Sequence, residues 1–312
     1  MIDKSTIDDA YALIKPYIRK TPVMDVSAAD ILGNRNQNNR INFKLELFQH
    51  AGCFKPRGAF YSLLSQATLP KAVAAASGGN HGAAVAYAAQ KLNVKANIFV
   101  PKAAPKAKVD RIKDFGAKVL LDGDNYAAAL ANCEQHIADT GAFSIHAYDD
   151  ISTITGQATV ALEWLEQVKD LDTVLIAVGG GGLISGMAAY IKQVTDIKIV
   201  AIEPANSASM YHAMANNTPV TVTPTSIASD SLGASLCGTN CFAIAKQYVD
   251  EFICIEDEDI LQAQTSLWNN YRILAELGGS AAFAALASGK YETSENEKIG
   301  VLICGGNTQF LS

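Results

Sequence analysis

The chain has 312 residues, of which 49% are hydrophobic and 18% are charged, and its formal net charge is −6. This length and apolar content predict about two domains with sizeable cores. The acidic balance, without a basic tract or interleaved basic and aromatic residues, argues against nucleic acid as a partner. Residues 1–20 predict a polar amphipathic helix with neither a signal peptide nor a membrane span, so no membrane partner is expected and the expected location is cytoplasmic. The six cysteines lack zinc-ligand spacing.

Lys55 lies between two predicted elements, a strand over 41–47 and an apolar helix over 59–66 in which Pro56 suits the first turn. An amine at such a junction faces a cleft and is partly desolvated, which weakens its preference for the charged form. It then becomes nucleophilic toward an aldehyde, which is Schiff-base chemistry. The alternative is an ordinary solvated helix start, with Arg57 two residues further on.

A glycine-rich turn over 77–82 follows a short alanine-rich strand and opens a helix. Asn80 and the backbone amides around it then lie at a helix N-terminus, which attracts anions. From Ala72 onward, strands and helices alternate. The predicted elements are a strand over 97–100, a helix over 105–115, a strand over 117–121, a helix over 125–139 and a strand over 143–146. These predict a small, mobile α/β domain over 71–148.

A second glycine run follows a predicted buried strand over 174–178 and consists of Gly179, Gly180, Gly181 and Gly182, before Leu183 and a helix over 184–194. Successive amides in such a run converge on one phosphate. The alternative is a dinucleotide fingerprint formed with Gly186 and Glu203, and hence a nicotinamide-dependent oxidoreductase. Its spacing departs from the standard fingerprint and leaves Lys55 and the 77–82 turn without a role, whereas a phosphorylated aldehyde uses all three segments.

The rest of the chain predicts a second, larger parallel sheet. Its predicted elements are a helix over 157–168, strands over 174–178 and 198–203, a helix over 257–277 and a strand over 298–304. The fold class is therefore α/β, with two open, mostly parallel twisted domains: 1–70 with 149–312, and 71–148. A ligand is expected in the cleft between them, at the carboxyl ends of strands.

Four motifs in chain order resemble the fold type II pyridoxal-phosphate enzymes, whose fold is that of the tryptophan synthase beta subunit. They are Cys53-Phe54-Lys55-Pro56-Arg57-Gly58-Ala59, Ser77-Gly78-Gly79-Asn80-His81-Gly82, Gly179 to Leu183, and Cys304-Gly305-Gly306-Asn307. The match looks nearest to the threonine/serine dehydratase branch, which also contains serine racemase, and it covers nearly the whole chain.

The resemblance implies a role for each of these segments. Lys55 would form the Schiff base with pyridoxal 5'-phosphate and act as general base, and Phe54 would pack beside the cofactor ring. Asn80 would bond the ring hydroxyl, and Cys304 would face the pyridine nitrogen. The amides of Gly179, Gly180, Gly181, Gly182 and Leu183 would bind the phosphate, and the substrate carboxylate would meet Ser77, Asn80 and His81. We expect a homodimer or homotetramer.

Cys304 favours one reaction among those of the family. A thiol cannot keep the pyridine nitrogen protonated as a carboxylate would, and a neutral ring favours prompt loss of a β-leaving group. The expected activity is therefore dehydration and deamination of L-threonine to 2-oxobutyrate and ammonia, or of L-serine to pyruvate and ammonia. The alternatives are a serine racemase, a β-replacement synthase, and, more distantly, the oxidoreductase or a non-catalytic binder of a phosphorylated ligand. Taken alone, Cys304 is more typical of a buried, inert thiol at a strand end, and its place before Gly305-Gly306-Asn307 is what favours the cofactor role.

Three positions depart from the family pattern. Racemase-like members have a second serine where this chain has Gly78, and glycine cannot transfer a proton. Metal-binding members have an acidic residue where this chain has Ser209, so Glu203 is expected to cap a helix or pair with a base, and no metal site is predicted. Leu277 replaces a proline after Glu276, whose role stays open.

Overall fold

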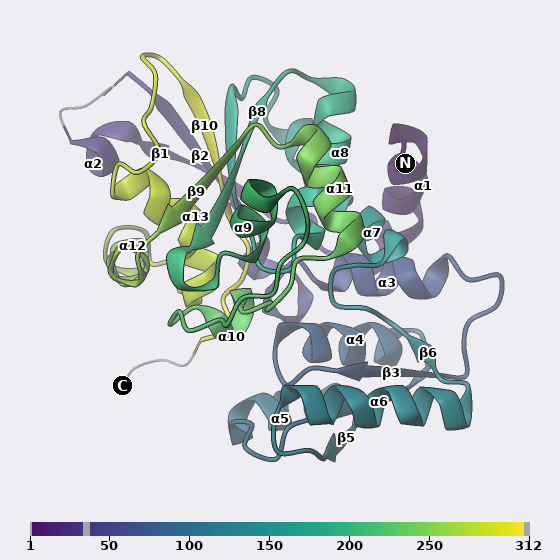
Figure 1. Ribbon diagram of the computed structural model, residues 1–312. Helices are drawn as coiled ribbons and strands as arrows, with labels where there is room; N and C mark the ends of the chain where they lie inside the picture. Colours follow the sequence, from purple (N-terminus) through teal and green to yellow (C-terminus); the bar gives the residue numbers. More distant parts are fainter. Residues whose placement is uncertain (1, 34–37, 309–312) are drawn as a thin grey trace.

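The computed structural model describes residues 2–33 and 38–308, and these form two sheets with helices packed on their faces (Figure 1). The larger sheet has the strand order β1-β2-β10-β7-β8-β9. Only β1 runs antiparallel to its neighbour; the other pairs are parallel. Its strands are β1 (Val23–Ser27), β2 (Arg40–Leu45), β7 (Thr173–Ala177), β8 (Lys198–Pro204), β9 (Glu251–Ile255) and β10 (Lys298–Ile303).

The central strands of this sheet are buried on both faces, as a parallel sheet covered by helices requires. Its helices are α1 (Lys4–Ile14), α2 (Ala28–Leu32), α7 (Ile151–Gln167), α8 (Gly182–Val194), α9 (Ser209–Asn216), α10 (Ser229–Leu232), α11 (Thr239–Tyr248), α12 (Asp257–Tyr271) and α13 (Leu277–Ala287). Short 3-10 turns occur at Lys15–Tyr17, Glu46–Phe48, His50–Gly52 and Ala205–Ser207.

The smaller sheet is parallel, with the strand order β5-β4-β3-β6. Its strands are β3 (Ala72–Ala76), β4 (Lys95–Val100), β5 (Lys118–Leu121) and β6 (Phe143–Ser144), and its helices are α4 (Asn80–Lys91), α5 (Lys106–Asp114) and α6 (Tyr126–Thr140). Helices α4 and α6 cover opposite faces of it (Figure 1). Helix α3 (Pro56–Leu64) packs against both α4 and α7. The residues at the start of α3 therefore lie between the two sheets.

The predicted α/β class and the parallel arrangement are confirmed, and several predicted elements are wrong in extent. The helix over 157–168 begins six residues earlier, at Ile151. The strand over 41–47 ends at Leu45, because its last two residues enter the 3-10 turn Glu46–Phe48. The strand over 143–146 pairs only at Phe143–Ser144. The helix over 257–277 ends at Tyr271, where Arg272 takes a left-handed φ of 57°. The predicted domain boundaries at 71 and 148 stay predictions.

Candidate active site

The segment that carries Lys55 is attached to the end of β10. The amide of Phe54 donates to the carbonyl oxygen of Cys304 at 3.2 Å, and the amide of Gly306 donates to the carbonyl oxygen of Gly52 at 2.9 Å. An isolated antiparallel bridge joins Cys53 to Gly305. The first and last predicted motifs, about 250 residues apart in the chain, therefore form adjacent parts of one structure.

Lys55 is half-buried, and its Nζ lies 3.5 Å from the carbonyl oxygen of Ala147. Burial lowers the pKa of Lys55, while Cys53, Cys304 and Glu276 act in the opposite direction. Among the described residues, no carboxylate forms an ion pair with it. An amine in this position has a larger neutral fraction than an exposed lysine, and neutral amine is the form that attacks an aldehyde.

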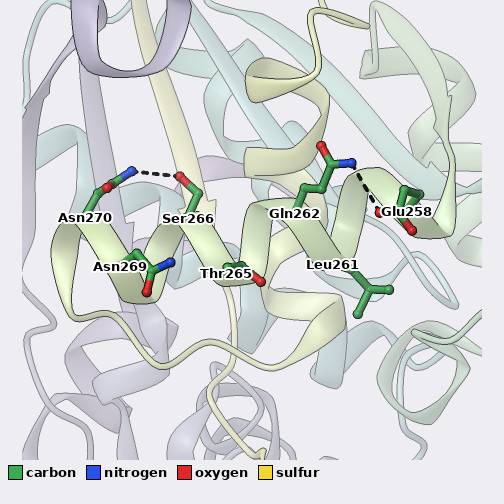
Figure 2. A pocket seen from close by; sticks show the side chains of 7 residues that line it. All are labelled: Glu258, Leu261, Gln262, Thr265, Ser266, Asn269 and Asn270. Carbon is green, nitrogen blue, oxygen red and sulfur yellow. Dashed lines mark hydrogen bonds between the residues drawn. The ribbon is translucent and has the colours of Figure 1, made fainter.

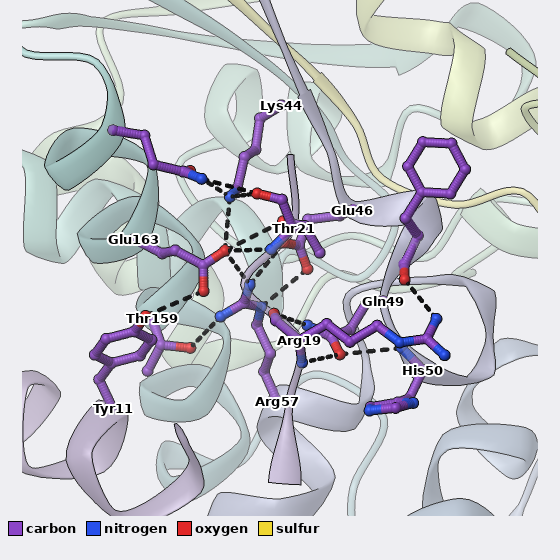
Figure 3. Close-up of polar contacts among 12 residues, drawn as sticks. Tyr11, Arg19, Thr21, Lys44, Glu46, Gln49, His50, Arg57, Thr159 and Glu163 are labelled. Carbon is purple, nitrogen blue, oxygen red and sulfur yellow. Dashed lines mark hydrogen bonds and ion pairs between the residues drawn. The ribbon is translucent and has the colours of Figure 1, made fainter. Parts of the chain in front are cut away.

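A buried ion network fixes the first turn of α3 (Figure 3). Arg57 donates to both oxygens of Glu46 at 2.9 and 2.7 Å, and to Glu163 of α7 at 2.9 Å. Lys44 of β2 donates to Glu163 at 2.7 Å. All four side chains are fully buried, and their two positive and two negative charges balance. Arg57 is thus not the solvated residue that the alternative interpretation of this motif required.

Neutral groups complete the hydrogen bonding of this network. Thr21 donates through its amide to Glu163 at 2.9 Å and through its hydroxyl to Glu46 at 2.5 Å, and Tyr11 of α1 donates to Glu163 at 3.2 Å. Buried charges are tolerated when their hydrogen bonds are satisfied in this way. The network joins α1, β2, α3 and α7, and it holds the chain two residues beyond Lys55 against the larger sheet.

The glycine run over 179–182 joins β7 to α8 and has the form of an anion site. Gly181 has a φ of +97°, a backbone conformation that favours glycine. The main-chain amides from Gly179 to Leu183 donate no hydrogen bond to any other described residue. These donors lie at the N-terminus of a 13-residue helix, where the helix dipole adds a positive field.

Tyr148 packs directly on this run, a contact that no local sequence pattern predicts. A Cβ added to Gly180 would lie 2.3 Å from the Tyr148 ring, and one added to Gly182 would lie 2.7 Å from the Tyr148 carbonyl oxygen. Neither position has room for a side chain. Ala147, whose carbonyl faces Lys55, precedes Tyr148, so one short segment touches both the Lys55 amine and the glycine run.

The turn over 77–79 leads into the N-terminus of α4, which no side chain caps. Ser77 accepts from the amide of Gly79 at 3.2 Å. His81 is buried, and its Nε2 lies 2.8 Å from the carbonyl oxygen of Ile145. Burial lowers the pKa of His81 to about 3, so the ring is neutral and donates this hydrogen bond. The imidazole is therefore a structural anchor, and acid–base work by this side chain is disfavoured.

A chain of side-chain hydrogen bonds crosses the site from α13 to α5. Asn80 donates to Glu276 at 2.6 Å and accepts from Asn307 at 2.5 Å. Asn307 also donates to the carbonyl oxygen of Ala51 at 2.9 Å, and it accepts from Arg111. Asn80 is thus held by two partners. Arg111 was not predicted, because nothing in the local sequence of α5 distinguishes it from the other basic residues there.

Glu276 is the carboxyl group of this cluster. Burial raises the pKa of Glu276 to about 7, although the hydrogen bond from Asn80 acts in the opposite direction. A Cβ added to Gly305 would lie 2.0 Å from its Oε1. Cys304 is buried next to Gly305, and burial raises the pKa of the Cys304 thiol far above its usual range. Cys304 is therefore a neutral thiol.

Glu203 caps α9. This is the first of the two roles expected from the sequence, which were to cap a helix or to pair with a basic residue. Its two oxygens accept from the amides of Met210 at 2.9 Å and Tyr211 at 2.6 Å. Both oxygens are therefore occupied by main-chain donors. Within residues 2–33 and 38–308, no group of three or more His, Cys, Asp or Glu side chains is arranged to hold a metal ion. In the same residues, no helix is both long and apolar enough to cross a membrane.

A surface pocket lies along α12, apart from all of these residues (Figure 2). It is lined by Glu258, Leu261, Gln262, Thr265, Ser266, Asn269 and Asn270. Its polar side chains bond along the helix, Gln262 to Glu258 at 3.3 Å and Asn270 to Ser266 at 3.1 Å. None of the predicted site residues lines it.

Residues 14–305 match the family model of the pyridoxal-phosphate dependent enzymes. The chain belongs to this family. It is 34% identical to a serine racemase of Oryza sativa subsp. indica, with 98% of this chain and 91% of the relative covered. It is 33% identical to a catabolic L-threonine dehydratase of Staphylococcus aureus (strain N315), with coverages of 98% and 89%. The structure of maize serine racemase superposes with a TM-score of 0.93 at 34% identity, over 99% of this chain and 94% of that one. The family fold is type II, and its cofactor is pyridoxal phosphate.

The residues present fit this cofactor. The glycine run supplies unpaired amides for a phosphate, and the packing around Gly180 and Gly182 allows only glycine there. Lys55 supplies an amine that burial pushes toward its neutral form. Cys304, whose carbonyl oxygen accepts from the amide of Phe54 beside Lys55, supplies a small neutral group suited to an unprotonated ring nitrogen.

Proposed function

We propose that this chain is an ammonia-lyase that converts L-threonine to 2-oxobutyrate, L-serine to pyruvate, or both, with release of ammonia. The observation that carries this proposal is the environment of Gly78. A Cβ added there would lie 2.9 Å from the Cγ1 methyl of Val100, so this position faces an apolar side chain. Racemisation needs a proton donor on the face of Cα opposite Lys55, and racemase-like members of the family have a serine at this position. Elimination needs no such donor.

The proposed chemistry uses few of the chain's own groups. When bound, the cofactor supplies a sink for the electron pair left at Cα. Lys55 takes the Cα proton as general base, and burial lowers its pKa and so increases the neutral fraction that can accept this proton. The β-hydroxyl takes up a proton and leaves as water, so the hydroxide and the Cα proton are both accounted for. The enamine product then tautomerises to an imine, and water hydrolyses this imine to a 2-oxo acid and ammonia. We assign Phe54, Asn80, the amides of Gly179 to Leu183, and Cys304 to cofactor binding.

We assign substrate-carboxylate binding to Ser77, Asn80 and His81 at the uncapped N-terminus of α4. Because the His81 ring is bonded to Ile145, its contribution would come from the main-chain amide. This clamp orients the Cα–H bond toward Lys55, and such orientation contributes substantially to rate. We also propose that 71–148 moves as a unit against 1–70 and 149–312, since its strands β3, β4, β5 and β6 form a sheet separate from the larger one.

The test measures both reactions on the same substrate. Purified protein with bound cofactor is incubated with L-serine and with L-threonine; 2-oxo acid and ammonia are measured together, and chiral separation measures D-serine. We expect 2-oxo acid and ammonia in equal amounts and much less D-serine. Formation of D-serine faster than pyruvate would overturn the proposal. Serine racemase is the second candidate, because the chain is as similar to serine racemases as to threonine dehydratases.

A further inference from the structure

Arg111 is a basic residue of α5 that reaches the Lys55 segment. Its guanidinium donates to the Oδ1 atom of Asn307. A Cβ added to Gly52, three residues before Lys55, would lie 2.9 Å from its Nη2 atom. The next residue, Ile112, packs beside Gly82 in the first turn of α4. Helix α5 thus brings a guanidinium between the start of α4 and the segment that carries Lys55.

Arg111 has no acidic partner among the described residues, whereas three lysines close to it in the chain do. Lys102, Lys106 and Lys108 form ion pairs with Asp124, Asp110 and Asp230. No carboxylate in the described ranges forms an ion pair with Arg111, and one amide oxygen, that of Asn307, is its hydrogen-bond acceptor. A guanidinium has five N–H donors. Most of the donors of Arg111 are therefore left for a ligand.

Two separate anion-binding features meet here. One is the uncapped N-terminus of α4, which the proposed function assigns to the substrate α-carboxylate. The other is Arg111, whose planar fork suits a carboxylate held by two hydrogen bonds. Asn307 bonds to both Arg111 and Asn80, so one side chain separates the two features. A substrate with one carboxylate would use one of them and leave the other unpaired.

We propose that Arg111 is a specificity-determining residue that binds the second carboxylate of a dicarboxylic 3-hydroxy amino acid, such as 3-hydroxyaspartate. This inference rests on the proposed function, and it names a substrate class for it. A dicarboxylic amino acid carries one more negative charge than serine or threonine, and Arg111 supplies the matching positive charge. The nearby Glu276 does not repel the second carboxylate when the Glu276 carboxyl group is protonated. The side-chain amide of Asn80 also lies between Glu276 and Asn307.

The kinetic test compares kcat/KM for 3-hydroxyaspartate with kcat/KM for L-threonine. We expect the wild type to favour 3-hydroxyaspartate. Arg111→Met should lower the ratio of the two values by about 10- to 100-fold, the effect of losing a hydrogen bond between charged groups. Lys113→Met is the matched control, since it removes a positive charge from an exposed position of the same helix. It should leave the ratio within about twofold, as surface substitutions have small effects.

A binding measurement separates this inference from the proposed reaction. Succinate and butyrate are titrated calorimetrically into the wild type and the Arg111→Met variant, each with bound cofactor. We expect the wild type to bind succinate at least about tenfold more tightly than butyrate, and the variant to lose that difference. Since neither probe reacts, this result decides the role of Arg111 even if the enzyme racemises its substrate.

Two outcomes would overturn the assignment of Arg111. If Arg111→Met lowers kcat/KM for both substrates by the same factor, Arg111 only orients Asn307. If the wild type binds succinate no more tightly than butyrate, there is no second carboxylate site. If neither 3-hydroxyaspartate nor L-threonine yields a 2-oxo acid, the lyase proposal is contradicted. If the wild type still binds succinate preferentially, Arg111 remains the contact for a second carboxylate.

Discussion

Lys55 is separable from the stability of the protein, because its side chain is half-buried and its Nζ has one long main-chain contact. We predict that Lys55→Ala abolishes 2-oxo acid production and the visible absorbance of the lysine-bound cofactor. The melting temperature of the apoprotein should stay within about 2 °C, since no buried ion pair is broken. Lys71→Ala, at an exposed position, is the control and should change neither property. Turnover by Lys55→Ala near the wild-type rate would refute the site.

Gly78 allows the choice between elimination and racemisation to be tested by substitution. Gly78→Ser alone would place its Cβ against Val100, so we combine it with Val100→Ala, which removes the contacting methyl groups. We predict that the double variant forms D-serine from L-serine faster than the wild type does, because the serine hydroxyl can protonate the opposite face of Cα. Chiral chromatography measures the rate, and Val100→Ala alone is the control. An unchanged D-serine rate would mean that the residue at 78 does not decide between the reactions.

At the residue scale, sequence predicts the site where its members are neighbours in the chain. Lys55, the 77–82 turn and the 179–183 run could be found because each chemistry-bearing residue has its glycines beside it. Tyr148 and Arg111 could not, because their roles come from contacts with Gly180 and Asn307, far away in sequence. The burial of Arg57 depends on Glu163, 106 residues away, and no local pattern reports it.

At the scale of elements, Glu203 couples the end of β8 to α9. Burial raises the pKa of Glu203 to about 8, against the opposing effect of the Met210 and Tyr211 amides. Between its ordinary value of 4.5 and about 8, the folded protein keeps a proton that the unfolded chain has released. Folding stability should therefore fall as pH rises through this window.

We predict that Glu203→Gln makes the decline of stability between about pH 5 and 8 shallower, by at most about 1.4 kcal/mol per pH unit. Glutamine cannot ionise, and its carbonyl oxygen can still accept from the α9 amides. Urea unfolding midpoints across this range measure the effect. Glu295→Gln, at an exposed position, is the control and should leave the slope unchanged. An unchanged slope in Glu203→Gln would mean that the carboxylate is ionised as it caps α9.

The sequence predicts elements best where their burial is one-sided. Helices α5 and α12 bury one face, and their predicted starts at 105 and 257 agree with the observed starts at Lys106 and Asp257 to within one residue. Helix α13 is buried on nearly all sides and is composed mostly of small apolar residues, so it shows no helical period and no helix is predicted over 278–287 from the sequence. Helix α12 ends before Arg272, which adopts a left-handed backbone conformation. Because this residue is neither glycine nor proline, the usual sequence signal for a helix end is missing.

At the scale of the molecule, the buried ion network joins segments that share no sheet or helix. We predict that Arg57→Leu lowers the free energy of unfolding by about 3–5 kcal/mol, because Glu46 and Glu163 would stay buried without their partner. Urea denaturation measures the loss. Arg40→Leu breaks an exposed ion pair with Asp170 and should cost less than about 1 kcal/mol. If both variants lose the same free energy of unfolding, the buried network contributes no more to stability than an exposed ion pair.

The order of strands in the larger sheet has a consequence for the synthesis of the protein. The smaller sheet pairs strands between residues 72 and 144, so it can form while the rest of the chain is still being made. In contrast, β2 must wait for β10, whose residues begin at Lys298. Cys304 reaches the Lys55 segment only then. The nascent chain therefore carries its reactive lysine for most of its synthesis without a complete binding site, and capture of the cofactor is expected to be one of the last events of folding.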